Sequence, residues 1–191
     1  MSQEDQVAPD ALLQLMRSRR SVRRYRPDPL PDEVLQQVLE AGRWAPSAKN
    51  QQPWAFVVVQ EEEMRKEVAR HATYYLTRHA RVDEAPVLIV LCAQARTRAS
   101  RHPASGDVRM AGMQMMLQAK ALGLGTCWVD GLERGEIAQA LHIPDYLDIV
   151  GLLTVGFPAE TPPETPRKPL FEIVHYDLYE SLTFGSAAST R

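Results

Sequence analysis

Basic and polar residues gather in two short stretches near the start of the chain. The first reads RRSVR at residues 19–23, and the second reads SAKNQQ at residues 47–52. Guanidinium groups bind phosphate through paired hydrogen bonds, and the hydroxyl of a serine adds a neutral donor. The side chains of Ser47, Asn50 and Gln52 offer donors and acceptors together, which suits the edge of a heteroaromatic ring. We interpret the two stretches as two walls of one pocket for a phosphate-bearing planar cofactor.

Each stretch also has a simpler explanation when it is taken alone. Residues 19–23 could be a solvated helix end, where arginine suits the negative end of the helix dipole. Residues 47–52 could be an ordinary turn before a strand. Arg167 and Lys168 follow a proline-rich segment and could either reach a distant phosphate or lie in solvent. Spacing alone leaves these alternatives open.

The glycines at 123 and 125 do not form a dinucleotide-binding motif. The pattern GxGxxG would place glycine at position 128, where Trp128 stands, and a helical pattern rather than a strand precedes the glycines. The simplest interpretation is a helix C-cap that leads into a strand.

The sequence predicts no metal site and no catalytic acid, base or nucleophile. The five histidines form neither HExxH nor a Cys/His ligand set, and the chain lacks a P-loop and a GxSxG elbow. The two cysteines, Cys92 and Cys127, lie in apolar runs and are expected to be buried and reduced.

Composition places the chain among ordinary globular proteins. Its 191 residues are 45% hydrophobic and 24% charged, with a net charge of -2, which favours one domain and gives no attraction to nucleic acid or anionic membranes. The first ten residues are polar and acidic, so we expect no signal peptide. No apolar run reaches the ~18 residues of a transmembrane helix. The expected location is therefore the cytoplasm.

Helical and extended patterns alternate along the chain. We predict helices over 11–19, 31–42, 61–80, 108–122 and 133–141, and strands over 54–59, 86–93, 126–129 and 149–157. The continuous apolar run at 54–59 is typical of a strand covered on both faces. Residues 96–106 are expected to form a surface loop, and the proline-rich segment 159–169 an extended tail.

The helix predicted at 108–122 is apolar almost all round, and Asp107 is a suitable cap for it. Such a helix needs cover on every side, which one small domain does not easily provide. This pattern predicts a subunit interface.

Four segments, in this order, resemble the nitroreductase family of FMN-dependent oxidoreductases. They are RRSVRRY (19–25), AGRWAPSAKNQQPWAF (41–56), ALGLGTCWV (121–129), and GFPAE (156–160) with the later RKPLFEIVHY (167–176). The resemblance implies an α+β fold with a central, mainly antiparallel sheet flanked by helices, assembled as an intertwined homodimer. It implies one domain over 11–180, whose segment 158–180 wraps the partner, between a flexible segment 1–10 and a frayed end 181–191.

The resemblance also implies roles for individual residues. Those expected to hold the FMN phosphate and ribityl chain are Arg19, Arg20, Ser21 and Arg23, with Arg167 and Lys168 completing the phosphate clamp. Those expected to approach the flavin from the other subunit are Ser47, Asn50 and Gln52. Those whose backbone is expected near the ring edge are Trp128, Val129, Asp130 and Gly131.

The implied activity is a ping-pong transfer of two electrons from NADH or NADPH, through the flavin, to a nitroaromatic, quinone or related acceptor. Two alternatives stay open. One is a specialised relative, such as a dehalogenase, a flavin-destroying enzyme or an oxygen-dependent dehydrogenase. The other is a flavin-binding protein without turnover. The lid that sets the substrate is expected in residues 71–80 or in residues 96–106.

Overall fold

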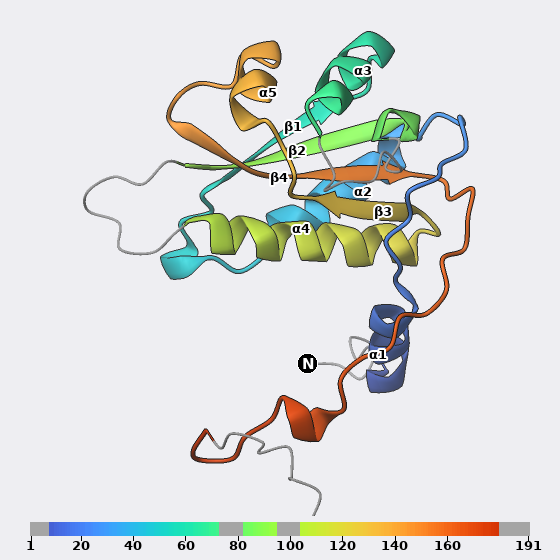
Figure 1. Ribbon diagram of the computed structural model, residues 1–191, viewed down its shortest axis with the longest axis vertical. Helices are drawn as coiled ribbons and strands as arrows, with labels where there is room; N and C mark the ends of the chain where they lie inside the picture. The colour runs from blue at the N-terminus through green and yellow to red at the C-terminus, as the bar shows by residue number, and fades with distance from the viewer. Residues whose placement is uncertain (1–7, 73–81, 95–103, 180–191) are drawn as a thin grey trace, which may run out of the picture.

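The computed structural model describes residues 8–72, 82–94 and 104–179 (Figure 1). The α-helices are α1 (Pro9–Ser18), α2 (Asp32–Arg43), α3 (Glu62–Arg70), α4 (Ala104–Ala121) and α5 (Arg134–Ala140). The strands are β1 (Trp54–Val59), β2 (Val87–Gln94), β3 (Gly125–Val129) and β4 (Leu147–Gly156). Short 3₁₀ turns lie at η2 (Ala48–Asn50), η3 (Val82–Glu84) and η4 (Leu170–Glu172).

The four strands form one sheet in the order β1-β2-β4-β3, and each neighbouring pair is antiparallel. The two central strands are buried along almost their whole length, as their continuous apolar sequences require. β1 lies at the edge, and all of its residues except Val59 are only half-buried. The expectation that β1 is covered on both faces is therefore not met within one chain. The α+β class and the antiparallel sheet are confirmed.

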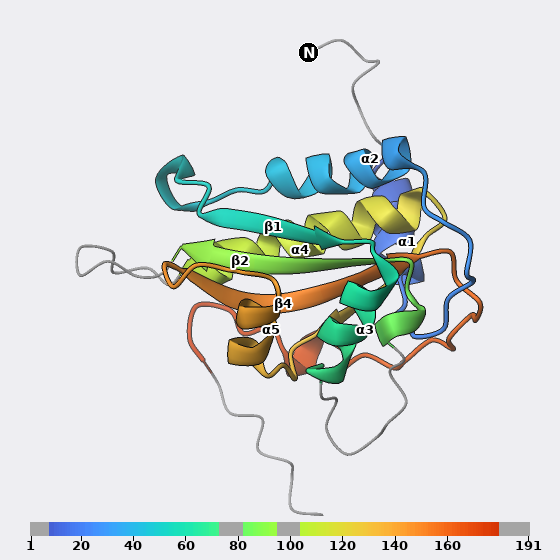
Figure 2. The ribbon, with the colours of Figure 1, turned by 90° about the horizontal axis from the view of Figure 1, so that it is seen from above.

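Helices cover both faces of the sheet (Figure 2). Because successive strand residues point to opposite faces, β2 supplies both cores. On one face Ile89 and Leu91 pack with α2 and α4, and on the other Leu88 and Val90 pack with α3 and α5. The sheet is thus the middle layer of three. Among the described residues no helix is long and apolar enough to span a bilayer.

α4 begins at Ala104, four residues before the predicted helix. Asp107 consequently lies inside its first turn and does not cap it, which corrects that expectation. Its carboxylate instead accepts the backbone N–H of Ala48 at 3.2 Å, and so ties α4 to the 47–52 turn. The buried side of α4 faces α2 and the sheet, whereas Met110 and Met113 remain 41% and 40% exposed. One chain therefore does not cover the helix all round.

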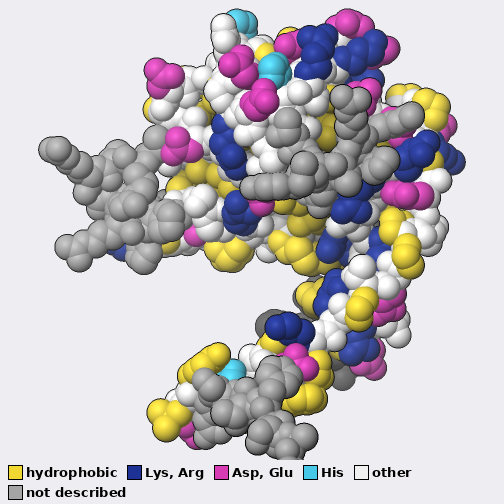
Figure 3. Space-filling view, in the orientation of Figure 1, with side chains coloured by type: hydrophobic (Ala, Val, Ile, Leu, Met, Phe, Trp, Pro, Cys, Tyr) yellow, Lys and Arg dark blue, Asp and Glu magenta, His cyan; other side chains and the backbone are white. Residues whose placement is uncertain are grey.

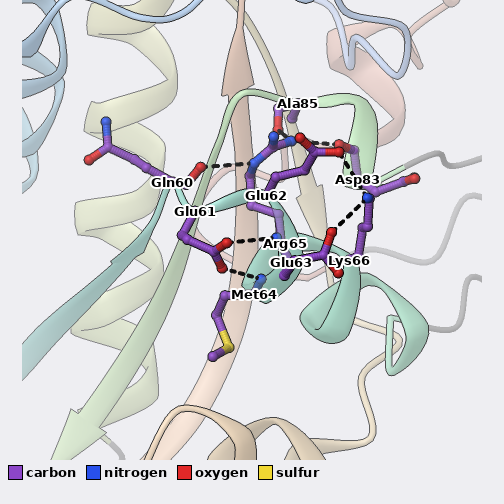
Figure 4. A network of polar contacts seen from close by, with 9 residues as sticks. All are labelled: Gln60, Glu61, Glu62, Glu63, Met64, Arg65, Lys66, Asp83 and Ala85. Atoms are coloured by element: carbon purple, nitrogen blue, oxygen red, sulfur yellow. Dashed lines mark hydrogen bonds and ion pairs between the residues drawn. The ribbon is translucent and has the colours of Figure 1, made fainter.

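Polar contacts fix the start of α3 and its position on the sheet (Figure 4). The carboxylate of Glu61 accepts the N–H groups of Glu63 and Met64 and caps the helix. The guanidinium of Arg65 donates to the carbonyl groups of Gln60, Asp83 and Ala85, and so joins α3 to η3 and the entry of β2.

α3 ends at Arg70. The sequence predicted a helix as far as residue 80, and for residues 71 and 72 that prediction is wrong. His71 leaves the helix and contacts Glu133 just before α5. The rest of that predicted helix, and most of the 96–106 loop, lie outside the described residues. Both expected lid segments fall largely in these parts.

After β4 the chain leaves the sheet as an arm, which we define as residues 158–179. Residues 159–169 form neither helix nor strand, as predicted, and the arm then passes α1 and ends beyond η4 (Figure 1). α1 itself starts at Pro9, inside the segment that was expected to be flexible.

Candidate functional site

Residues 19–23 lie against the start of edge strand β3. Ser21 forms a parallel bridge with Thr126, and the N–H of Val22 donates to the carbonyl of Thr126 at 2.9 Å. Gly125 permits this approach, because a Cβ there would lie 2.7 Å from Cγ1 of Val22. The second glycine of the 123–125 pair therefore has a packing role, while Gly123, with a φ of 78°, ends α4 as the predicted cap.

The first residues of the arm hold the other side of this basic stretch. The N–H of Ala159 donates to Arg24 O, and the N–H of Arg26 donates to Phe157 O, both at 2.9 Å. The Oε1 atom of Glu160 accepts the backbone N–H groups of Arg23 at 2.6 Å and Arg24 at 3.2 Å. Hydrogen bonds to β3 on one side and to the arm on the other therefore hold the stretch in place.

Arginines from both ends of the chain line one cavity of about 190 Å³. Its lining residues are Met16, Arg17, Arg20, Glu164, Thr165 and Arg167. The guanidinium of Arg20 donates to Arg17 O at 2.5 Å and lies 3.5 Å from the carboxylate of Glu164. The cavity is smaller than the ~300 Å³ of a typical small-ligand site, so its size suits a phosphate or another fragment of a cofactor.

The remaining residues of the predicted clamp are not among those that line this cavity. Arg19, Ser21 and Arg23 are half-buried, whereas Lys168 is exposed beside Arg167 in the arm. Burial raises the pKa of the Cys127 thiol, and the guanidinium groups of Arg23 and Arg19 oppose that rise.

The 47–52 turn has an unusual backbone. Lys49, Asn50 and Gln52 have φ values of 54°, 55° and 49°, in the left-handed region that non-glycine residues rarely adopt. The hydroxyl of Ser47 accepts the N–H of Gln52 at 2.9 Å and closes the turn. Asn50 and Gln52 are both exposed. Such strain is concentrated at functional sites, where the surrounding structure maintains it.

One chain does not bring the two sequence-predicted walls together. The 47–52 turn is tied to the N-terminal end of α4 through Asp107, and residues 19–23 lie beside Gly125, just beyond its C-terminal end. The 18 residues of α4 separate these ends by about 27 Å (Figure 1). The two stretches are therefore not two walls of one pocket within a single chain.

The end of β3 is held by packing and by an arginine. The indole of Trp128 lies between Gly112 and Gly151, where an added Cβ would approach it to 2.4 and 2.2 Å. Arg109 lies over the indole at 5.4 Å and donates to both carboxylate oxygens of Asp130, at 3.1 and 3.0 Å. The Arg109 guanidinium lowers the pKa of Asp130 below its ordinary value.

Val129 and Gly131 flank this carboxylate. Val129, just before Asp130, is buried in the sheet, and Gly131, just after Asp130, is half-buried. The contacts of Trp128 and Asp130 therefore hold the end of β3 close to the N-terminal half of α4.

Sequence reasoning did not identify three residues that contact the cavity, the arginine stretch or the end of β3. Arg17 lies in the last turn of α1, three residues before Arg20, and its closeness in sequence to the arginine stretch was a usable signal. Glu160 and Arg109 gave no such signal, because their partners lie far away in the chain.

Within residues 8–72, 82–94 and 104–179 there is no group of three potential metal ligands. Cys92 and Cys127 are free and buried, as expected. Burial raises the pKa of Cys92 to about 11, so this thiol stays protonated near neutral pH.

The fold and the site define an α+β protein with an arginine cluster beside the edge of an antiparallel sheet. The model of the nitroreductase family matches residues 16–76 and 67–157. The chain therefore belongs to the nitroreductase family.

Individual relatives agree with this assignment. An NADH dehydrogenase of Thermus thermophilus is 32% identical, over 82% of this chain and 91% of its own length. An FMN reductase [NAD(P)H] of Bacillus subtilis is 29% identical, over 84% of this chain and 71% of its own. The crystal structure of a nitroreductase family protein from Clostridium difficile 630 is 29% identical, over 87% of this chain and 98% of its own, with a TM-score of 0.76.

The similarity extends to a relative with a specialised name. An iodotyrosine deiodinase of Thermotoga neapolitana is 26% identical, over 88% of this chain and 98% of its own. Membership of the family thus fixes neither the acceptor nor the substrate.

Proposed function

We propose that this chain is an NAD(P)H-dependent FMN oxidoreductase that works as a homodimer. The observation that carries the proposal is the cavity in which Arg17 and Arg20, from the start of the chain, meet Arg167 of the arm. Three guanidinium groups and the single carboxylate of Glu164 leave this small cavity with a net positive charge, which suits the charge and size of a phosphate. The FMN reductase name of the Bacillus subtilis relative supports the choice of cofactor.

In this proposal the cofactor lies along the edge of β3. Its phosphate and ribityl chain contact Arg19, Arg20, Ser21, Arg23, Arg167 and Lys168. The strand then leads from Thr126 to Asp130, four residue steps or about 13 Å, which takes the ring to the backbone of residues 128–131. When bound, FMN supplies the two-electron chemistry between NAD(P)H and the acceptor. The chain's own part is to bind, to orient and to place backbone N–H groups at the ring edge.

The second subunit supplies the 47–52 turn. Within one chain this turn lies at the opposite end of α4 from the arginine stretch, and we assign the turn that approaches the flavin to a partner. α1, α4 and the arm expose apolar side chains that a partner subunit could bury (Figure 3). They include Leu13, Met110, Met113, Leu170 and Phe171, which are 40% to 73% exposed. Exposed apolar side chains of this kind on several elements favour an interface.

We assign nitroaromatics, quinones or a related two-electron acceptor as the oxidising substrate. The specialised alternative, such as reductive dehalogenation, is favoured by the similarity to the iodotyrosine deiodinase. Both activities use the same proposed FMN site. They are distinguished by which acceptor the enzyme reduces.

The test begins with purified protein that has been freed of flavin. FMN titration should restore a flavin absorption band, and anaerobic mixing with NADH or NADPH should bleach it. Steady-state consumption of NAD(P)H with menadione, a nitrofuran and iodotyrosine then identifies the acceptor. FMN-loaded protein that is not reduced by either nicotinamide would contradict the oxidoreductase and leave a flavin-binding protein.

A further inference from the structure

Glu160, at the start of the arm, makes an uncommon contact with the arginine stretch. One carboxylate oxygen accepts two consecutive backbone N–H groups, those of Arg23 and Arg24, at 2.6 and 3.2 Å. Glu160 is half-buried, so this contact is partly shielded from water. A carboxylate that accepts backbone N–H groups makes stronger bonds than a neutral acceptor does.

The contact lies where backbone pairing around the stretch is interrupted. On the β3 side, the N–H of Val22 donates to Thr126 O. On the arm side, backbone bonds join Arg26 to Phe157 and Ala159 to Arg24. Between these fixed points the N–H groups of Arg23 and Arg24 are held by the side chain of Glu160. Removing that side chain would leave the part-buried N–H of Arg23 and the exposed N–H of Arg24 without their acceptor.

We propose that Glu160 is a positioning residue for the phosphate end of the cofactor site. It holds the backbone of Arg23 and Arg24 against the arm, and thereby sets the direction in which the side chain of Arg23 leaves the stretch. This inference rests on the proposed function, because it assigns FMN phosphate as the ligand of the stretch. Glu160 itself does not contact the phosphate, since its carboxylate is bonded to backbone and would repel an anion.

The same contact couples the arm to the cofactor. Arg167 reaches the cavity only if the arm leaves the sheet in the observed direction, and Glu160 fixes that departure. Binding of phosphate between Arg20 and Arg167 therefore also favours the arm in its observed position.

The test compares Glu160→Ala and Glu160→Gln in the full chain. Alanine removes the acceptor, and the dissociation constant for FMN, measured by titration of the flavin-free protein, should rise about tenfold or more. Glutamine retains an acceptor oxygen in the same place and removes a negative charge from beside the arginines, so it should bind FMN at least as tightly as the wild type. Limited proteolysis without FMN should cut the arm faster only in the alanine variant.

Asp28→Ala is the matched control. Asp28 lies near the same stretch, and its replacement by alanine removes the same charge. In the wild type its carboxylate makes an exposed ion pair with Arg26 at 3.3 Å. Its dissociation constant for FMN should stay at the wild-type value. A wild-type constant for Glu160→Ala, or equal weakening in the alanine and glutamine variants, would overturn the positioning role. Wild-type protein that fails to bind FMN would overturn the proposed function and this role together.

Discussion

At the scale of single residues, the assignment depends on Arg20 and Arg167. Both line the small cavity, yet they come from opposite ends of the chain. The double variant Arg20→Ala with Arg167→Ala removes two charge-assisted partners of the phosphate, each worth about 1.5–3 kcal/mol. We expect the dissociation constant for FMN, measured by fluorescence titration, to rise at least a hundredfold.

The matched control for this pair is Arg43→Ala with Arg70→Ala. Both of these arginines form exposed ion pairs within a helix, with Glu40 and Glu67. Their loss changes the net charge equally and should leave the affinity for FMN near the wild-type value. Equal weakening in both double variants would indicate a general charge effect and contradict the clamp.

His71 makes stability depend on pH. The carboxylate of Glu133, 2.9 Å from Nδ1, raises the pKa of His71 above its ordinary value, and Glu67 adds to the rise. Protonated His71 therefore favours the folded state below the unfolded pKa of about 6.5, and this contribution is lost as the pH rises through the raised pKa.

The stability difference between the wild type and His71→Gln should accordingly shrink with rising pH. Urea unfolding midpoints of both proteins between pH 5.5 and 9 measure it. A difference that stays constant over this range would show that the ion pairs of His71 do not act in solution.

At the scale of elements, the contact between β4 and Trp128 is sensitive to volume. A Cβ at Gly151 would lie 2.2 Å from the indole, which is held on its other side by Gly112. Gly151→Ala should lower the free energy of unfolding by about 1–3 kcal/mol, because the indole has no free space to move into. Thermal and urea unfolding measure the loss.

Gly106→Ala is its control in the first turn of α4. A Cβ at Gly106 meets no atom within 4 Å, so alanine should be neutral or stabilise the helix by up to about 1 kcal/mol. Equal destabilisation by the two substitutions would contradict the packing explanation.

Arg65 joins α3 to the strand entry (Figure 4). Its guanidinium satisfies three carbonyl groups from two separate segments. Arg65→Ala should lower the free energy of unfolding by about 1–3 kcal/mol, whereas Lys66→Ala on the exposed side should change it by less than about 1 kcal/mol. Chemical denaturation that gives similar values for both would refute this role.

At the scale of the whole molecule, the arm and α4 expose more apolar surface than a monomer needs. A chain that ends at Pro169 retains Glu160 and Arg167 but loses the exposed Leu170 and Phe171. If the proposed homodimer forms through the arm, this shortened chain should dissociate at concentrations at which the full chain is dimeric, because it lacks the apolar surface proposed to be buried on the partner. Sedimentation velocity over a range of concentrations measures this.

A full-length variant with Leu170→Ser and Phe171→Ser separates lost burial from lost length. It should dissociate like the shortened chain. Undiminished dimerisation of both proteins would place the interface elsewhere and contradict the wrapped arm.

The sequence by itself determined the α+β class, the family and most of the strands and helices. The strands and helices follow from local physics: β-branched apolar runs at 54–59 and 149–156, a glycine cap at 123, and prolines that end helices. The α+β class and the family follow from the resemblance of four segments to the nitroreductase family. The sequence also indicated the arginine stretch as a candidate phosphate site, although the stretch alone was compatible with a solvated helix end and only its combination with the other family segments favoured the phosphate.

Only the tertiary structure decided which of these residues meet. It brought Arg167 to Arg20, placed Glu160 under the backbone of Arg23, and separated the 47–52 turn from the arginines by the length of α4. The physical reason is that such contacts depend on the path of the chain over the sheet and on the direction in which the arm leaves it. Local sequence patterns do not encode that path, so two stretches that read as one pocket can lie at opposite ends of a helix.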